Sequence, residues 1–111
     1  MAKKIIWSQD SIDDLEDIIQ YINNRSGKEI AKSIYKRIIE KIENVLAFPG
    51  SGRKVPELDI LSNSEIHEVI ESPWRIIYRI TENELCIISV IDGRRNVEEI
   101  LYKKIIDGKM R

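Results

Sequence analysis

The sequence contains few of the residues that build cross-linked or metal-bound domains. Among its 111 residues there is one cysteine, Cys86, and one histidine, His67. A disulfide framework needs paired cysteines and a zinc centre needs several ligands at defined spacing, so the sequence excludes both. We therefore expect neither a metal nor another cofactor. A single unpaired thiol is also typical of the reducing cytoplasm, where we expect the protein to be located.

Hydrophobic runs are short, and neither sign of charge is in large excess. The apolar start of the chain turns polar at Ser8, well short of the roughly 20 apolar residues that a membrane helix needs. Lysine and arginine number 18, and aspartate and glutamate 19, which gives a formal net charge of −1. We therefore expect no membrane contact and no uniformly cationic surface for nucleic acid. A chain of this length has room for one small core, so residues 1–111 are predicted to form a single domain.

Charge is distributed unevenly along the chain, because the middle segment at residues 49–71 is acidic and the C-terminal third is mildly basic. The predicted strands and loop of that last third carry four arginines: Arg75, Arg79, Arg94 and Arg95. These arginines either form a binding surface or pair with acidic groups on neighbouring elements, as exposed charges commonly do.

The first half of the chain has the pattern of a helix hairpin. A short apolar run at residues 3–8 predicts a strand, and Ser8 then stands at the N-cap of a helix. Apolar residues follow at helical spacing: Ile12, Leu15, Ile18, Ile19 and Ile22. Ser26 and Glu29 have the spacing of a capping box, which predicts a second helix that continues until Pro49. Two helices joined by so short a turn are expected to pack antiparallel.

The second half of the chain has the pattern of a sheet. Turn-forming residues dominate positions 49–64, which are expected to form an irregular loop across the surface. Three strand-like runs follow at residues 65–71, 74–81 and 84–91. Asn96 then precedes a short apolar segment that predicts a C-terminal helix.

Side-chain alternation along the middle strand divides its residues between two faces. Trp74 and Tyr78 share the face that we expect to form the core, while Arg75 and Arg79, with Arg95, are expected on the opposite face. The predicted fold is therefore α+β. It consists of an antiparallel β-sheet, made of the N-terminal strand and a three-stranded meander, with the helix hairpin packed on one face.

An ordered set of short motifs runs along almost the whole chain. They are Ile6-Trp7-Ser8, Asp14-Leu15, Tyr21-Ile22, Phe48-Pro49, Gly52-Arg53-Lys54-Val55-Pro56-Glu57, Trp74-Arg75-Ile76-Ile77-Tyr78-Arg79-Ile80 and Gly93-Arg94-Arg95. In this order the chain resembles the RelE/ParE toxin superfamily, and it is more similar to the ParE-like branch. The resemblance implies a cytoplasmic toxin of a type II toxin-antitoxin system, held inactive in a hetero-oligomer by a cognate antitoxin.

The resemblance implies two alternative targets. ParE-like toxins poison DNA gyrase, whereas RelE-like toxins cut messenger RNA on the ribosome without a metal. We expect growth inhibition by gyrase poisoning, which makes the protein a non-enzymatic binding module, with Arg53, Arg79, Arg94 and Arg95 as target-binding candidates. A ribosome-dependent mRNA endoribonuclease and a divergent, inactive relative are the alternatives.

The ribonuclease alternative would give catalytic roles to two arginines. By resemblance, Arg75 corresponds to a phosphate-binding arginine of the RelE-like branch and Arg95 to its second arginine. His67 and Glu68 are then the candidate acid and base, since RNA cleavage needs a group to activate the 2′-hydroxyl and another to protonate the leaving oxygen.

The chain departs from the RelE-like pattern at two places. The paired lysines of that branch correspond to Ile66 and Glu68, which offer a hydrocarbon and a negative charge where a phosphate must be held. The C-terminal tyrosine of that branch corresponds to Leu101. Tyr102 is one residue out of register, a rotation of about 100° on a helix.

Some features also have structural interpretations. Arg75 and Arg79 could form cross-strand ion pairs with Glu68 and Glu71. Gly52 is expected to supply an unusual backbone angle in the crossing loop. About a fifth of the residues are isoleucine, more than one small core can bury. The apolar surface left along the helix hairpin and the sheet edge would accept the amphipathic tail of an antitoxin.

Overall fold

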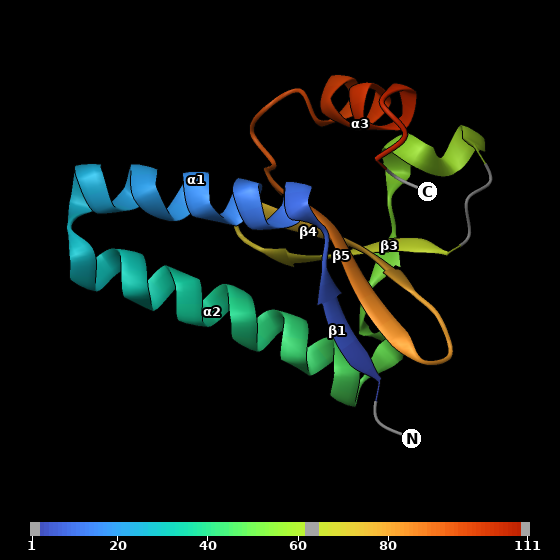
Figure 1. The fold of residues 1–111 in the computed structure, drawn as a ribbon, viewed down its shortest axis with the longest axis horizontal. Coiled ribbons are helices and arrows are strands. Elements are labelled where there is room, and N and C mark those ends of the chain that lie inside the picture. Colours follow the sequence, from blue (N-terminus) through green and yellow to red (C-terminus); the bar gives the residue numbers. More distant parts are fainter. Residues whose placement is uncertain (1–2, 62–64, 110–111) are drawn as a thin grey trace.

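The computed structural model describes residues 3–61 and 65–109, which form an α+β domain with a helix hairpin on one face of a sheet (Figure 1). In chain order the elements are β1 (Lys4–Trp7), α1 (Gln9–Ser26), α2 (Lys28–Ala47), η1 (Pro49–Ser51), β2 (Arg53–Lys54), η2 (Pro56–Leu61), β3 (Ile66–Glu71), β4 (Trp74–Ile80), β5 (Glu84–Asp92) and α3 (Val97–Ile106). The loop end of the α1–α2 hairpin extends beyond the sheet.

The sheet is mixed, with the strand order β1-β5-β4-β3-β2. Strands β3, β4 and β5 form the predicted antiparallel meander, and β2 adds a short antiparallel strand beside β3. β1 pairs with β5 in parallel, Ile5 opposite Leu85, so the prediction of a purely antiparallel sheet is wrong. Ser8 continues this pairing through a 3.0 Å hydrogen bond from its N–H to the carbonyl of Ile87. The sequence gives no local signal of this orientation, because the partner strand lies near the other end of the chain.

The helix hairpin is confirmed, with one difference at its turn. The Ser8 hydroxyl caps α1 by accepting a hydrogen bond from the N–H of Ser11 at 3.1 Å. Ser26 is still helical, and Gly27 alone separates the two helices with a φ of 95°. Because this angle favours glycine, the chain can turn within one residue. The predicted capping box is therefore wrong, since α2 has Gly27 as its N-cap and no side-chain cap.

Each face of the sheet carries an apolar core. The core beneath the hairpin consists of Leu15, Ile22, Ala31, Ile38, Ile42, Val45, Val69, Trp74, Ile76, Tyr78, Leu85, Ile87 and Val90, as the aromatic face of β4 predicts. The second core consists of Val55, Leu58, Ile66, Ile77, Ile88, Ile91, Val97 and Leu101. The face that was predicted to display arginines is thus largely covered by η2 and α3. The crossing loop after α2 buries Val55 and Leu58 in this second core, although its apolar residues follow no helical or strand periodicity.

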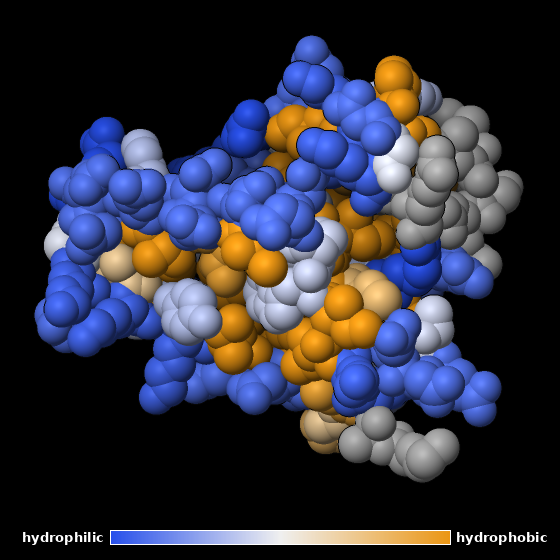
Figure 2. Space-filling model, in the orientation of Figure 1, coloured by the Kyte–Doolittle hydropathy of each residue, from blue (hydrophilic) through white to orange (hydrophobic). Residues whose placement is uncertain are grey.

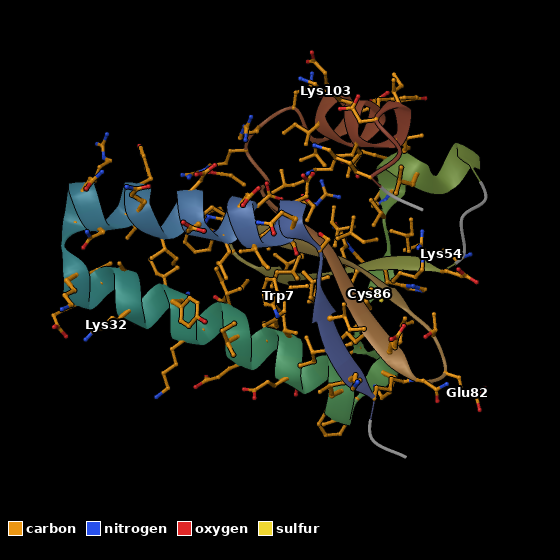
Figure 3. All side chains as sticks on the ribbon, viewed as in Figure 1. Trp7, Lys32, Lys54, Glu82, Cys86 and Lys103 are labelled. Carbon is orange, nitrogen blue, oxygen red and sulfur yellow. The ribbon has the colours of Figure 1, made fainter. Side chains whose placement is uncertain are left out.

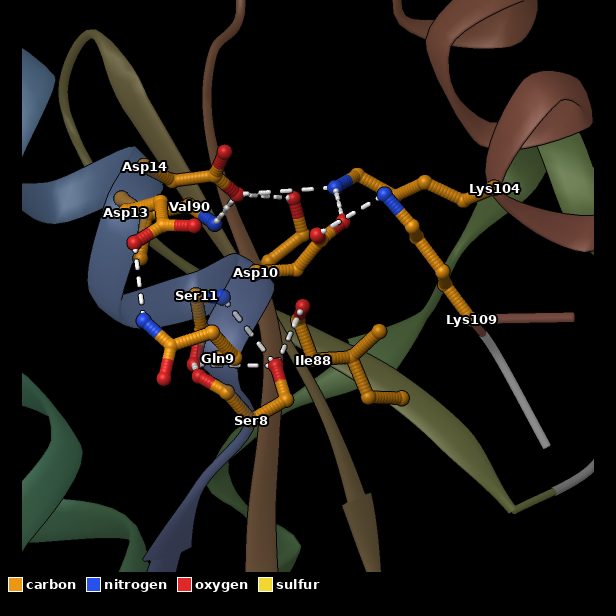
Figure 4. A network of polar contacts seen from close by, with 11 residues as sticks. Ser8, Gln9, Asp10, Ser11, Asp13, Asp14, Ile88, Val90, Lys104 and Lys109 are labelled. Atoms are coloured by element: carbon orange, nitrogen blue, oxygen red, sulfur yellow. Dashed lines mark hydrogen bonds and ion pairs between the residues drawn. The ribbon is translucent and has the colours of Figure 1, made fainter. Parts of the chain in front are cut away.

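An ionic network joins α3 to the beginning of α1 (Figure 4). The Lys104 ammonium group donates a short hydrogen bond to Asp10 and lies 3.7 Å from Oδ2 of Asp14. Lys109 approaches the other oxygen of Asp10 at 3.1 Å. The hydrogen bond from Lys104 is the main reason that the pKa of Asp10 is lowered. These contacts hold the C-terminal helix against the rest of the domain.

Asp14 also connects α1 to β5. Its Oδ2 accepts hydrogen bonds from the Ser89 hydroxyl at 2.6 Å and from the N–H of Val90 at 3.1 Å. Ser89 is fully buried, and the strand register is irregular beside it, between Ile77 and Tyr78 on β4. The carboxylate therefore satisfies backbone and side-chain donors at the point where the ladder is disturbed.

Candidate functional site

Arg75 lies on β4 in a fork of two carboxylates. Its Nη1 and Nη2 donate to the two oxygens of Glu57 at 2.8 and 2.7 Å, and its Nε donates to Oε1 of Glu68 at 2.7 Å. The side chain of Arg75 is only 12% exposed. Its hydrogen bonds with Glu57 are the main cause of a raised pKa for Arg75 and a lowered pKa for Glu57. The guanidinium group is therefore already bound by anions of the chain itself.

Glu68 extends this network to the sheet edge. It is fully buried, and its second oxygen accepts a 2.9 Å hydrogen bond from Nε of Arg53 on β2. Glu57, Arg75, Glu68 and Arg53 thus form a chain of alternating charges with no net charge, which is how a buried carboxylate is made tolerable. Arg53 remains 62% exposed at the surface end of the chain.

The structure separates the predicted arginines into two groups. Arg53, Arg75 and Arg79 are on β2 and β4, and the side chain of Arg79 is 19% exposed, with Nε 3.8 Å from Glu65. Arg94 and Arg95 follow β5, at the opposite end of β4 from Arg79, because Trp74 pairs with Asp92 and Arg79 pairs with Cys86. Arg79 is therefore separated from Arg94 and Arg95 by the length of β4, whereas Arg75 pairs with Ile91 near the end of β5.

Arg94 and Arg95 line a small pocket between α1 and the adjoining ends of β4 and β5. Its volume is about 350 Å³, and its lining is Asp14, Asp17, Ile18, Tyr21, Ile22, Trp74, Val90, Asp92, Arg94 and Arg95. Arg94 is held by Asp92 through bonds of 2.6 Å from Nη2 and 2.9 Å from Nε, and these bonds lower the pKa of Asp92. The side chain of Arg95 is exposed and forms no ion pair with any residue that the structure describes.

The structure does not bring the side chains of His67 and Glu68 together. Adjacent residues of a strand point to opposite faces, so His67 lies on the hairpin side while Glu68 lies in the charge network. The His67 ring stacks against Tyr78 with centroids 6.1 Å apart. The Tyr78 hydroxyl is buried and has no hydrogen-bond partner within residues 3–61 and 65–109, and burial raises the pKa of this phenol.

Gly52 lies directly against the Tyr78 hydroxyl. Its φ of −85° is an ordinary extended conformation, so the predicted unusual backbone angle is wrong. The glycine is needed for space instead. A Cβ atom at this position would overlap the hydroxyl oxygen and lie 2.9 Å from Cζ of Tyr78.

A larger apolar groove runs along the helix hairpin. Its volume is about 1030 Å³, and its lining is Trp7, Ile12, Leu15, Glu16, Ile19, Gln20, Asn23, Lys28, Ala31, Lys32, Tyr35 and Ile39. Figure 2 shows apolar side chains between the two polar rows of the helices, and Figure 3 shows Trp7 beside this region. Ile12 is 41% exposed and Tyr35 is 48% exposed. This groove is the apolar surface that the isoleucine content predicts along the helix hairpin.

The structure bears directly on metal binding and on membrane-spanning helices. In the described ranges, which leave out residues 1–2, 62–64 and 110–111, no three His, Cys, Asp or Glu side chains are placed to hold a metal ion. None of the helices over the same residues is both long and apolar enough to cross a membrane.

A strand, a helix hairpin and a three-stranded meander followed by two arginines are the arrangement that the resemblance to the RelE/ParE toxin superfamily predicts. The family model described as the ParE toxin of the type II toxin-antitoxin system parDE matches residues 5–97. The chain therefore belongs to the ParE family, the toxin components of type II toxin-antitoxin systems, and family membership implies a cognate antitoxin.

Two relatives agree with this assignment. The chain is 25% identical to the toxin ParE3 of Caulobacter vibrioides over 101 residues, which is 91% of this chain and 97% of that protein. Its fold matches a solved structure of the chromosomal ParDE toxin-antitoxin system from P. aeruginosa with a TM-score of 0.67 and 19% identity. That match covers 82% of this chain and 96% of the solved chain.

Proposed function

We propose that this toxin stops growth by binding and poisoning DNA gyrase rather than by cutting RNA on the ribosome. The observation that carries this proposal is the state of Arg75. Its Nε and both Nη nitrogens donate to Glu57 and Glu68, so a phosphate would have to displace a carboxylate to reach them. An arginine binds a phosphate most strongly when two of its N–H groups donate to the phosphate together, so these donors must be available.

Two further positions support gyrase as the target. Ile66 and Glu68, which take the places of the paired lysines of the RelE-like branch, are both buried. Leu101, at the place of the catalytic tyrosine, is fully buried in the second core, and Tyr102 is 45% exposed beside it. The proposed binding residues are therefore exposed arginines, namely Arg53, Arg94 and Arg95, with Arg79 as a less exposed member.

We further propose that the cognate antitoxin neutralises the toxin by docking an amphipathic segment in the hairpin groove. The groove is open and apolar, and Trp7 at one end of it belongs to β1, an edge strand of the sheet. A segment that fills the groove can therefore continue beside β1 and add a strand. The result is a toxin-antitoxin hetero-oligomer.

The test is induction of the protein without its antitoxin in bacteria, with two measurements on the same culture. We expect gyrase-dependent DNA breaks to accumulate while translated messenger RNA stays intact. Transcripts cut in phase with codons would instead establish the ribonuclease activity, with Arg75 and Arg95 as catalytic candidates. Unimpaired growth with neither lesion would identify a divergent, inactive relative.

The antitoxin site is tested with purified toxin and antitoxin. Tyr35→Ser removes an exposed ring from the groove and is expected to weaken antitoxin binding at least about tenfold, since buried aromatic residues dominate such interfaces. Lys41→Ser, on α2 but outside the groove lining, is the control. Equal affinity of the two variants would exclude the groove as the docking site.

A further inference from the structure

The pocket beside Arg94 and Arg95 has a chemistry that selects its partner. We propose that it binds a protein segment that inserts an apolar side chain and presents a carboxylate to Arg95, and that this contact recognises the toxin's target. The inference rests on the proposed function, because the target surface in question is that of gyrase. It assigns the recognition to protein contact and not to the DNA that gyrase holds.

The pocket lies on the opposite side of α1 from the hairpin groove. Along α1, the groove is lined by residues 12, 15, 16, 19, 20 and 23, whereas the pocket is lined by residues 14, 17, 18, 21 and 22. With about 100° between successive residues, the two sets are centred on opposite sides of the helix. No residue is shared between the two linings. Two different partners can therefore use the two surfaces.

The interior of the pocket is apolar and aromatic. Ile18, Ile22 and the largely buried Trp74 contribute to its lining, and its volume of about 350 Å³ has room for a large side chain. Tyr21 at the same pocket is 60% exposed, and the guanidinium carbon of Arg25 lies 5.6 Å from the centre of its ring. Tryptophan, tyrosine and arginine are the residues that dominate binding energy at protein–protein interfaces.

The charges around the pocket argue against nucleic acid. Asp14, Asp17 and Asp92 line it, and Asp92 neutralises Arg94. A phosphate backbone would meet these carboxylates, whereas nucleic-acid sites offer a continuous run of cations. Arg95 is exposed on the loop side and interacts electrostatically with Asp92, whose two oxygens already bind Arg94, and Asp17 is exposed on α1 without an ion pair among the residues that the structure describes. A protein segment with an acidic group and a basic group on either side of an apolar residue satisfies both.

The experiment compares variants on the two sides of α1. Tyr21→Ser and Arg95→Glu are made in the full chain, with Tyr35→Ser as the matched tyrosine control in the groove. Lys103→Glu on α3 is the matched charge control, because this exposed lysine lies outside the pocket lining. Binding is measured to purified gyrase without DNA, to a DNA duplex alone and to the antitoxin.

We expect Tyr21→Ser and Arg95→Glu to weaken gyrase binding at least about tenfold, as hot-spot substitutions do, while antitoxin affinity changes less than about twofold. Tyr35→Ser should show the reverse, and Lys103→Glu should change neither. Wild-type gyrase binding by both pocket variants would overturn the inference and leave the proposed function intact. If the two pocket variants lose antitoxin binding in addition to gyrase binding, the inference is also overturned. Tyr21 and Arg95 would then be needed for folding or for the antitoxin interface.

The duplex measurement separates the two classes of partner. If the unmodified toxin binds DNA alone and Arg95→Glu abolishes that binding, the pocket is a nucleic-acid site and the inference is wrong. If the unmodified toxin does not bind gyrase at all, the proposed function itself fails, which is a distinguishable result.

Discussion

The contact between Gly52 and Tyr78 allows a sharp test of how β2 is attached to the sheet. In a Gly52→Ala variant the new Cβ would overlap the Tyr78 hydroxyl oxygen and lie 2.9 Å from Cζ and 3.1 Å from the backbone oxygen of Glu68. Ordinary van der Waals contact begins at 3.4 Å, so either the ring or the chain at β2 must move. Tyr78 is 1% exposed and packed in the main core, which leaves the ring no space to swing away.

The expected cost is that of overpacking a rigid site. Inserting one carbon into a filled core costs about 2 to 3 kcal/mol when the surroundings cannot relax. For a domain of this size, that corresponds to a fall in Tm of about 8 to 12 °C. Gly50→Ala is the control, since a Cβ there meets no atom within 4 Å and is expected to leave the free energy of unfolding unchanged.

A double-mutant cycle with Tyr78→Phe separates the clash from other effects. Removing the hydroxyl, which has no partner within the described residues, should change the free energy of unfolding by less than about 1 kcal/mol. In the double variant the contacts to Cζ of the ring at 2.9 Å and to the backbone oxygen of Glu68 at 3.1 Å remain, so about half of the loss should be recovered. Urea unfolding measures the four proteins of the cycle and the Gly50→Ala control. A Gly52→Ala variant as stable as Gly50→Ala, or strictly additive losses, would refute the reasoning.

Three further predictions concern the charge network and α3. Glu68→Ala removes the buried acceptor of Arg75 and is expected to cost about 3 kcal/mol in urea unfolding; a loss below about 1 kcal/mol would mean that the network contributes little. Glu57 has a lowered pKa in the folded state, so its stabilising effect is complete at neutral pH and is lost as the pH falls through the folded pKa. The free energy of unfolding should begin to decline below the ordinary value of 4.5, and Glu57→Gln should make this decline shallower, which unfolding at a series of pH values will check. Lys104→Ala removes the link to Asp10, so amide hydrogens of α3 should exchange about fivefold faster, a loss of about 1 kcal/mol; unchanged exchange would mean that apolar packing alone holds the helix.

Local patterns predicted most of the fold. Ser8 and Asn96 cap the helices as predicted, because a cap depends on residues only three positions apart. The antiparallel meander and its aromatic core face also follow from short-range alternation. The parallel pairing of β1 depends instead on the position of β5 in the folded sheet, and no residue near β1 in the sequence determines that position. The turn at Gly27 was missed for two reasons. The spacing of a capping box often occurs by chance, and the sequence alone does not show that a glycine adopts a positive φ.

The candidate site was less predictable than the fold. Arg75 was a candidate catalytic residue of the ribonuclease alternative, but its partner Glu57 lies in a loop without periodicity and 18 positions away. The signal that could have found it is the pair Val55 and Leu58 on either side of Glu57, since two apolar residues in a turn-rich loop indicate that the loop packs against something. The sequence marked Tyr21 only as part of the Tyr21-Ile22 motif and gave it no functional role. Its position beside the arginines depends on how α1 crosses the sheet.

The order of elements along the chain has a consequence for the newly made protein. All but one of the residues lining the hairpin groove belong to α1 and α2, so they have been synthesised once the ribosome reaches Ala47. The pocket beyond α1 needs Trp74 and Arg95 as well. At the usual pace of translation, residues 48–95 take roughly 2 to 10 s to add. For that interval a nascent toxin already contains the α1 and α2 residues of the proposed antitoxin groove, while it still lacks Trp74 and Arg95 of the proposed target pocket.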